Sequence, residues 1–81
     1  MIKVDILFFG ALRSYFGNTL QVEIIAGSTL SNILNMLNEK NPEAGTSLKQ
    51  CQLAVNSEIE NKDFVISTAC EIAILPPFSG G

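Results

Sequence analysis

Hydrophobic and polar residues alternate in the first stretch of the chain, residues 2–9. Successive side chains of a strand point to opposite faces, so this pattern predicts a strand. The set that we expect to face the core is Ile2, Val4, Ile6 and Phe8. The other set starts with charged residues and ends with Leu7 and Phe9. These two are candidates for an exposed apolar patch, unless a helix or loop of the same chain covers them.

Further segments show the same period of two. Residues 19–25 predict a second strand antiparallel to the first, and residues 51–55 predict a third with Cys51, Leu53 and Val55 inward. After a turn at Asn56-Ser57, a short strand at 58–60 leaves Ile59 exposed or at an edge. Residues 64–66 form an apolar cluster. Residues 70–75 predict a last strand, with Cys70, Ile72 and Ile74 inward and Leu75 outward.

One segment has helical spacing instead. Its apolar residues fall at i, i+3, i+4 and i+7, namely Leu30, Ile33, Leu34 and Leu37. Ser28 or Thr29 can cap this helix, and Asn41-Pro42 ends it. A helix of one to two turns is expected within residues 10–17, and residues 42–50 are expected to cross irregularly. The order predicts an α+β fold, in which one main helix packs on a mixed sheet of about five strands.

The last strand runs into an unusual ending. Pro76 and Pro77 cannot donate to a sheet, so the strand stops and the chain leaves in a stiff, extended direction. Phe78 and Ser79 follow, and Gly80-Gly81 leaves the terminal carboxylate sterically open. A glycine pair alone is equally consistent with a frayed end. The stiffening prolines and the aromatic residue favour a projecting tail that another protein handles.

Composition limits the other possibilities. A chain of 81 residues builds one core, so we expect a domain over residues 1–75 and a flexible extended tail over 76–81. The net charge is -3 and the five basic residues are scattered, which argues against a nucleic-acid partner. No signal peptide or membrane helix is expected. We therefore expect a cytoplasmic protein that does not associate with membranes.

The chain has two cysteines and no histidine. We expect no metal site and no bound cofactor, because the usual zinc spacings are absent. Cys51 and Cys70 each open a strand, so in an antiparallel pair they lie at opposite ends, too far apart for a disulfide. Buried free thiols are the expected state. A sulfur-relay role for either cysteine lacks the basic neighbour that would form a thiolate.

Over essentially its whole length the chain resembles a known family, the small subunits of molybdopterin synthase, which are ubiquitin-like β-grasp sulfur carriers. The resemblance rests on the order of elements, the Ala54-Val55-Asn56 turn into a short edge strand, and above all the ending from Ile74 to Gly81. Gly-Gly is shared with ubiquitin and with the thiamine-pathway carrier, whereas the proline pair is closer to the molybdopterin branch. One departure is Thr68-Ala69-Cys70-Glu71, where family members often have Asp-Gly-Asp-Glu.

The resemblance implies a chemistry in which this chain carries sulfur and catalyses nothing alone. An adenylating enzyme of the ubiquitin-activating type uses ATP to adenylate Gly81, and sulfur from a donor protein replaces AMP to give a thiocarboxylate. The tail, Pro76 to Gly80 with the thiocarboxylate at Gly81, enters the large subunit of a heterotetrameric synthase. There it gives sulfur to cyclic pyranopterin monophosphate. The implied partner interface is Phe9, Ile59 and Leu75. Alternatives are a carrier for thiamine or another pathway, a ubiquitin-like modifier, and a simple interaction domain.

Overall fold

The computed structural model describes residues 1–77, so the predictions made for Phe78, Ser79, Gly80 and Gly81 lie outside the described residues. A five-stranded sheet in the order β2-β1-β7-β4-β5 forms the body of the domain. Its strands are β1 (Ile2–Phe8), β2 (Thr19–Ile24), β4 (Gln52–Val55), β5 (Glu58–Glu60) and β7 (Cys70–Leu75). A second sheet pairs two short strands, β3 (Ser28–Thr29) and β6 (Val65–Ile66). The predicted sheet of about five strands is confirmed.

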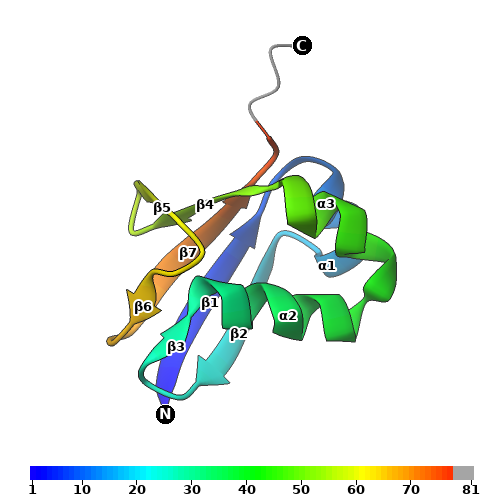
Figure 1. Cartoon of the computed structure of the whole chain (residues 1–81). Helices are drawn as coiled ribbons and strands as arrows, with labels where there is room; N and C mark the ends of the chain where they lie inside the picture. Colours follow the sequence, from blue (N-terminus) through cyan, green and yellow to red (C-terminus); the bar gives the residue numbers. More distant parts are fainter. Residues whose placement is uncertain (78–81) are drawn as a thin grey trace.

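The sheet is mixed, and its one parallel pair decides where the tail begins. β1 pairs antiparallel with β2 and parallel with β7, while β4 pairs antiparallel with both β7 and β5. Because β1 and β7 run in the same direction, both end at the same edge of the sheet. Figure 1 shows the end of β7 at the edge opposite the N-terminus.

The main helix, α2 (Leu30–Lys40), forms as predicted. Thr29 rather than Ser28 caps it: its hydroxyl accepts from the Asn32 amide at 3.2 Å, and the Asn32 side chain accepts from the Thr29 amide at 2.8 Å. The four apolar positions identified from the spacing are all buried, with Leu30 and Leu37 fully inaccessible. The helix therefore contributes one continuous face to the core.

The prediction of an irregular crossing over residues 42–50 is wrong. The segment folds as a 3-10 turn, η2 (Pro42–Ala44), followed by a helix, α3 (Gly45–Gln50). Asn41 accepts from the Glu43 amide at 3.3 Å and starts the turn. Ala44 and Leu48 are both buried at a spacing of four residues, which is a helical pattern too short to stand out in the sequence.

The short helix after β1 is confirmed, as η1 (Gly10–Leu12) leading into α1 (Arg13–Phe16). Gly17 ends it with a φ of 82°, which a glycine adopts without strain.

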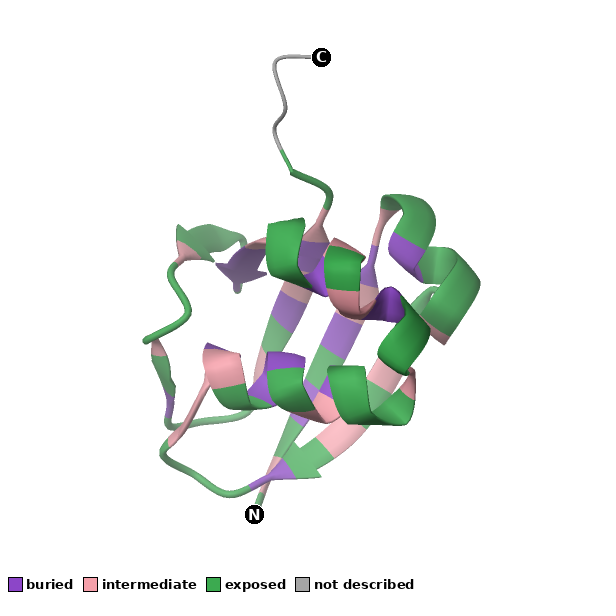
Figure 2. Cartoon of the chain, turned by 45° about the vertical axis from the view of Figure 1, so that its right-hand side comes forward, coloured by how far each residue is buried: buried purple, intermediate pink, exposed green. Residues whose placement is uncertain are grey.

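α2 and α3 lie on one face of the sheet (Figure 1). Buried residues alternate with exposed or half-buried ones along β1 and β7 (Figure 2). The core residues of the strands face the helices, whereas the exposed residues Asp5 and Glu71 lie on the other face of the sheet, as does Ala54, which is buried. Within residues 1–77, no helix is long and apolar enough to span a membrane.

The cysteines are free, but they are half-buried rather than buried as predicted. The third strand begins at Gln52, so Cys51 precedes it, and its thiol donates to the Leu48 carbonyl at 3.1 Å. Gln52 pairs with Leu75 and Cys70 pairs with Val4, which places the two cysteines at opposite ends of the sheet. That part of the disulfide argument is confirmed.

Candidate docking face and tail exit

The tail leaves the domain beside the turn that follows β1. The last paired residues are Phe8 and Ile74, so Phe9 and Leu75 come next on neighbouring strands. Pro76 then packs against Gly10, where an added Cβ would lie 3.6 Å from two carbons of the proline ring. Gly10 has a φ of 64°, a conformation that L side chains rarely adopt. The base of the tail is thus supported by β1 and its turn.

Four apolar residues line up across the sheet on the face that carries no described helix. The register pairs Leu7 with Ala73, Ala73 with Ala54, and Ala54 with Ile59. Paired residues share a face, so the four form one row from β1 to β5. We call this row, together with Phe9 and Leu75, the docking face.

The row of the docking face has large side chains at its two ends and small ones in the middle. Leu7 and Ile59 are the large members of the row, and Ile59 is 58% exposed. The two alanines between them project little, and Ala54 is only 6% exposed. Leu7 and Ala73 are half-buried, so the apolar row across four strands is exposed mainly at Ile59. An apolar row that is partly open to solvent is a candidate for a surface that another protein covers.

Phe9 is held by Arg13 of the helix that follows. The guanidinium carbon of Arg13 lies 5.3 Å from the centre of the Phe9 ring, within the range of a cation–π contact. The Nε of the same residue donates to the Phe8 carbonyl at 3.0 Å. On the other side of the backbone, Phe8 stacks on Phe16 with ring centres 4.8 Å apart. The short helix therefore fixes the end of β1 from both faces.

A small pocket lies at the root of the tail. It has a volume of about 60 Å³ and is lined by Pro76 and Pro77, by Phe9 and Leu12 from the β1 end, and by α3 residues including Gln50. Both prolines are exposed. The first two residues of the tail thus contact the domain on one side and are accessible to a partner on the other.

The structure brings together some of the residues predicted from sequence. Phe9 and Leu75 are neighbours at the tail edge, whereas Ile59 lies two strands away from Leu75, with β4 between them. The sequence left open whether a helix or loop of the same chain covers Leu7 and Phe9. This alternative is partly confirmed, because both residues are half-buried and Arg13 of the short helix covers one side of the Phe9 ring. Alternation alone places Ala73 on the outer face with Leu75, whereas the register is needed to join Ala54 to the row. Nothing in the sequence pointed to Arg13.

The members of the docking face are all apolar, so they offer contact area and no acid–base group of their own, while the exposed carboxylates of Asp5 and Glu71 lie on the same face of the sheet. The cysteines do not change this conclusion. Burial raises the pKa of the Cys51 thiol above its ordinary value of 9.0, although the charge of Lys62 and a backbone hydrogen bond partly oppose the shift. Burial likewise raises the pKa of Cys70. Both remain thiols at neutral pH, which disfavours the sulfur-relay role.

Comparison with known proteins identifies the family. The sequence profile described as the ThiS family matches residues 6–81, which is nearly the whole chain. The chain belongs to the ThiS family. A curated relative, the molybdopterin synthase sulfur carrier subunit of Mycobacterium tuberculosis, is 34% identical over 83 residues and covers all of both chains. The resemblance drawn from the sequence is thereby confirmed.

Solved structures agree with this ThiS-family assignment at the level of the fold. A putative molybdopterin converting factor subunit 1 from Pyrococcus furiosus superposes with a TM-score of 0.83 at 15% identity, covering 95% of this chain and 99% of that one. A complex of subunits 1 and 2 of the molybdopterin-converting factor from Helicobacter pylori gives 0.71 at 23% identity, covering 99% and 100%. A ubiquitin from Caldiarchaeum subterraneum gives 0.65 at 12% identity, covering 99% and 98%. This ThiS-family chain has the ubiquitin-like β-grasp fold.

Proposed function

We propose that this chain is the sulfur-carrier small subunit of a molybdopterin synthase and acts in the cytoplasm. The observation that carries the proposal is the full-length relationship to a sulfur carrier subunit, with the family match continuing through Gly81. The described structure supports it, because an apolar docking face meets the exit of a proline-stiffened tail at one edge of the sheet.

In this proposal the first step makes the carboxylate of Gly81 reactive. A carboxylate is anionic at neutral pH and a poor acyl donor. One of its oxygens attacks the α-phosphorus of ATP on a ubiquitin-activating-like partner enzyme, and pyrophosphate leaves. The product is a mixed anhydride between the glycine carboxyl group and AMP, which is a strong electrophile.

The second step stores sulfur on the chain. A sulfide equivalent delivered by a sulfur donor protein attacks the acyl carbon of Gly81, and AMP leaves with the bonding electrons. The chain now ends in a thiocarboxylate, whose sulfur is a good nucleophile. On the large subunit, this sulfur forms a bond to a carbon of cyclic pyranopterin monophosphate that loses an oxygen substituent, and water then cleaves the acyl–sulfur bond and restores the Gly81 carboxylate. Two such transfers supply the two sulfur atoms of the dithiolene.

The large subunit is proposed to cover the docking face while the tail enters its active site. Support comes from the Helicobacter pylori structure, whose relative of this chain is in a complex with subunit 2. Pro76 and Pro77 have restricted backbone freedom, so less conformational entropy is lost when the tail enters a narrow channel. The described residues of the tail thus serve as a stiff spacer between the face and the reactive end.

Mass spectrometry of the intact chain tests the proposal. After incubation with the activating enzyme, ATP and a sulfur donor, we expect a mass gain equal to the exchange of one oxygen for sulfur. A variant without Gly81 serves as the matched control and should gain nothing. If the native chain keeps its carboxylate, or instead forms stable conjugates with lysines of other proteins, the carrier function is wrong.

A further inference from the structure

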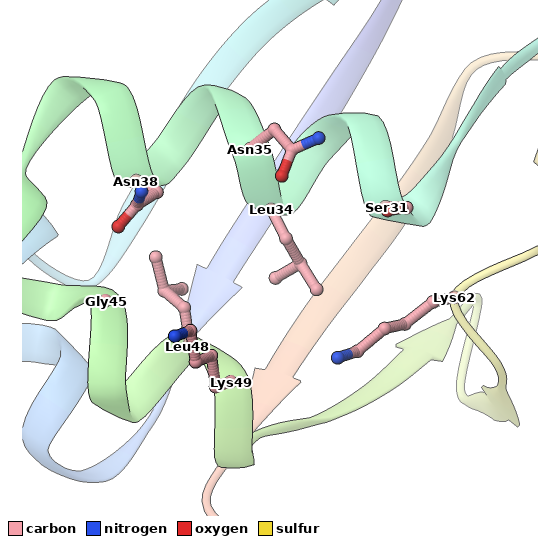
Figure 3. A pocket seen from close by; sticks show the side chains of 8 residues that line it. All are labelled: Ser31, Leu34, Asn35, Asn38, Gly45, Leu48, Lys49 and Lys62. Carbon is pink, nitrogen blue, oxygen red and sulfur yellow. The ribbon is translucent and has the colours of Figure 1, made fainter.

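A cleft lined by both polar and apolar residues lies between α2 and α3 (Figure 3). Both helices lie on the face of the sheet opposite the docking face (Figure 1). Its volume is about 130 Å³. Leu34 and Leu48 point into the gap from the two helices and form its floor, and they are only 8% and 3% exposed. The cleft is therefore a defined hollow above a packed core rather than a gap in mobile surface.

The two charged residues that line this cleft are both basic. Lys49 lies in the last turn of α3, and Lys62 lies in the loop between β5 and β6. The chain carries five basic and eight acidic residues, yet two of the basic ones line the cleft and none of the acidic ones do. A net negative chain thus has a local concentration of positive charge, which attracts anions.

Uncharged hydrogen-bonding groups complete the lining. They come from three residues of α2: Ser31, Asn35 and Asn38. Their hydroxyl and amide groups can donate to an oxyanion. Asn38 packs against Gly45, where an added Cβ would lie 2.9 Å from its Oδ1 atom. Glycine at this position therefore leaves room for the Asn38 side chain at the wall of the cleft.

The backbone that carries Lys62 is held in place. Its carbonyl accepts from the Ser31 amide at 3.0 Å, which ties the loop to the first turn of α2. The turn that follows is closed by Asn61, which accepts from the Asp63 amide at 2.9 Å and the Phe64 amide at 3.1 Å. Figure 3 shows the Lys62 side chain extending from this loop toward α3. Because the backbone of Lys62 is held in place, less conformational entropy is lost when its ammonium group pairs with a ligand.

We propose that the cleft binds a small oxyanion, a phosphate or a carboxylate group, between the ammonium groups of Lys49 and Lys62. The two lysines neutralise its charge, and the α2 side chains donate to its remaining oxygens. The proposal is independent of the sulfur-carrier function, because the cleft lies on the opposite side of the sheet from the docking face.

The test is a titration of the whole chain followed by ¹H–¹⁵N NMR, with inorganic phosphate and, separately, acetate, at constant ionic strength. We expect saturable shifts of the Asn35 and Asn38 side-chain amides and of the Ser31 and Lys62 backbone amides. The double variant Lys49→Gln/Lys62→Gln should weaken binding about tenfold, since each exposed charge pair contributes modestly. The matched control Lys3→Gln/Lys40→Gln removes the same charge elsewhere and should bind like the native chain.

The two probes separate the sources of the ligand. Stronger binding of phosphate indicates a phosphorylated small molecule, and stronger binding of acetate indicates an acidic side chain of a partner; either result supports the site. The proposal is overturned if neither probe gives saturable shifts, if the shifts spread over the whole surface, or if the control variant loses as much affinity as the cleft variant. The spectra also report whether each variant is folded.

Discussion

The guanidinium of Arg13 lies 5.3 Å from the centre of the Phe9 ring, and its Nε donates to the Phe8 carbonyl. One side chain therefore holds both the backbone at the end of β1 and the aromatic ring that follows it. The relationship explains how a residue outside the regular strand keeps a fixed position next to the tail exit. It also makes Arg13 a positioning residue for the docking face.

Replacing Arg13 with leucine should remove the cation–π contact and the hydrogen bond together. We expect the free energy of unfolding to fall by about 1 kcal/mol, since each contact contributes modestly at an exposed position. Affinity for the large subunit should fall as well, because Phe9 loses its support. Urea denaturation and calorimetric binding measure the two effects. Arg13→Lys keeps the charge and should retain part of both; an Arg13→Leu variant with native affinity would contradict the positioning role.

Ile59→Arg should weaken binding of the large subunit by at least about tenfold, because it places a charge in an apolar contact. Ile59 is 58% exposed, so the substitution should leave the melting temperature nearly unchanged. Ile25→Arg is the matched control: Ile25 is 70% exposed, but it follows the last residue of β2, the edge strand on the other side of the sheet from β5. Equal losses of affinity for the two variants would show that the docking face is not the interface.

Most of the fold could be predicted because its elements are long enough to show their period. The helix at Leu30–Lys40 has four apolar residues at helical spacing and a capping residue before it. By contrast, α3 has only six residues. It begins at Gly45 and directly follows the η2 turn that begins at Pro42, and both residue types usually indicate a loop. The two-residue strands β3 and β6 were missed for a related reason, since alternation cannot be detected over two positions.

The docking face was predicted in part. Alternation identified Leu7, Phe9 and Leu75 as outward apolar residues, and Ile59 stood out between two glutamates. Alternation places Ala73 outward with Leu75, but a small residue gives no hydrophobic signal that would assign it to a patch. The position of Ala54 follows only from the register, in which Ala54 lies opposite both Ala73 and Ile59. The family resemblance, rather than the pattern, supplied the role of the face.

Asn56 should be important for stability at the β4–β5 turn. Asn56 and Ser57 have φ values of 48° and 74°, as in a two-residue hairpin, and the Asn56 side chain accepts from the Glu71 amide at 3.0 Å. Asn56→Gly keeps the backbone conformation but loses that bond, so we expect a loss of about 1 kcal/mol in urea denaturation. Ser57→Gly, which relieves a positive φ, should be neutral or stabilising. An Asn56→Gly variant as stable as the native chain would mean that the bond contributes nothing.

The raised pKa of Cys51 has a consequence for stability at alkaline pH. Because burial favours the neutral thiol in the folded state, the unfolded chain releases its proton at lower pH than the folded chain. The stabilisation is therefore complete below the ordinary pKa of 9.0 and is lost as the pH rises through the higher folded value. We expect the free energy of unfolding to fall above about pH 9, and to fall less steeply in a Cys51→Ala variant.

Thiol reactivity measures the same property directly. In a Cys70→Ala background, Cys51 should react with a disulfide reagent more slowly than a free thiol at pH 8, because little of it is thiolate and its sulfur donates to the Leu48 carbonyl. The rate should rise with pH to a midpoint above 9.0. The reverse variant, Cys51→Ala, reports Cys70, whose pKa is also raised by burial. A midpoint for Cys51 below that of a free thiol would mean that the charge of Lys62 outweighs burial, and it would reopen the possibility that this cysteine carries sulfur.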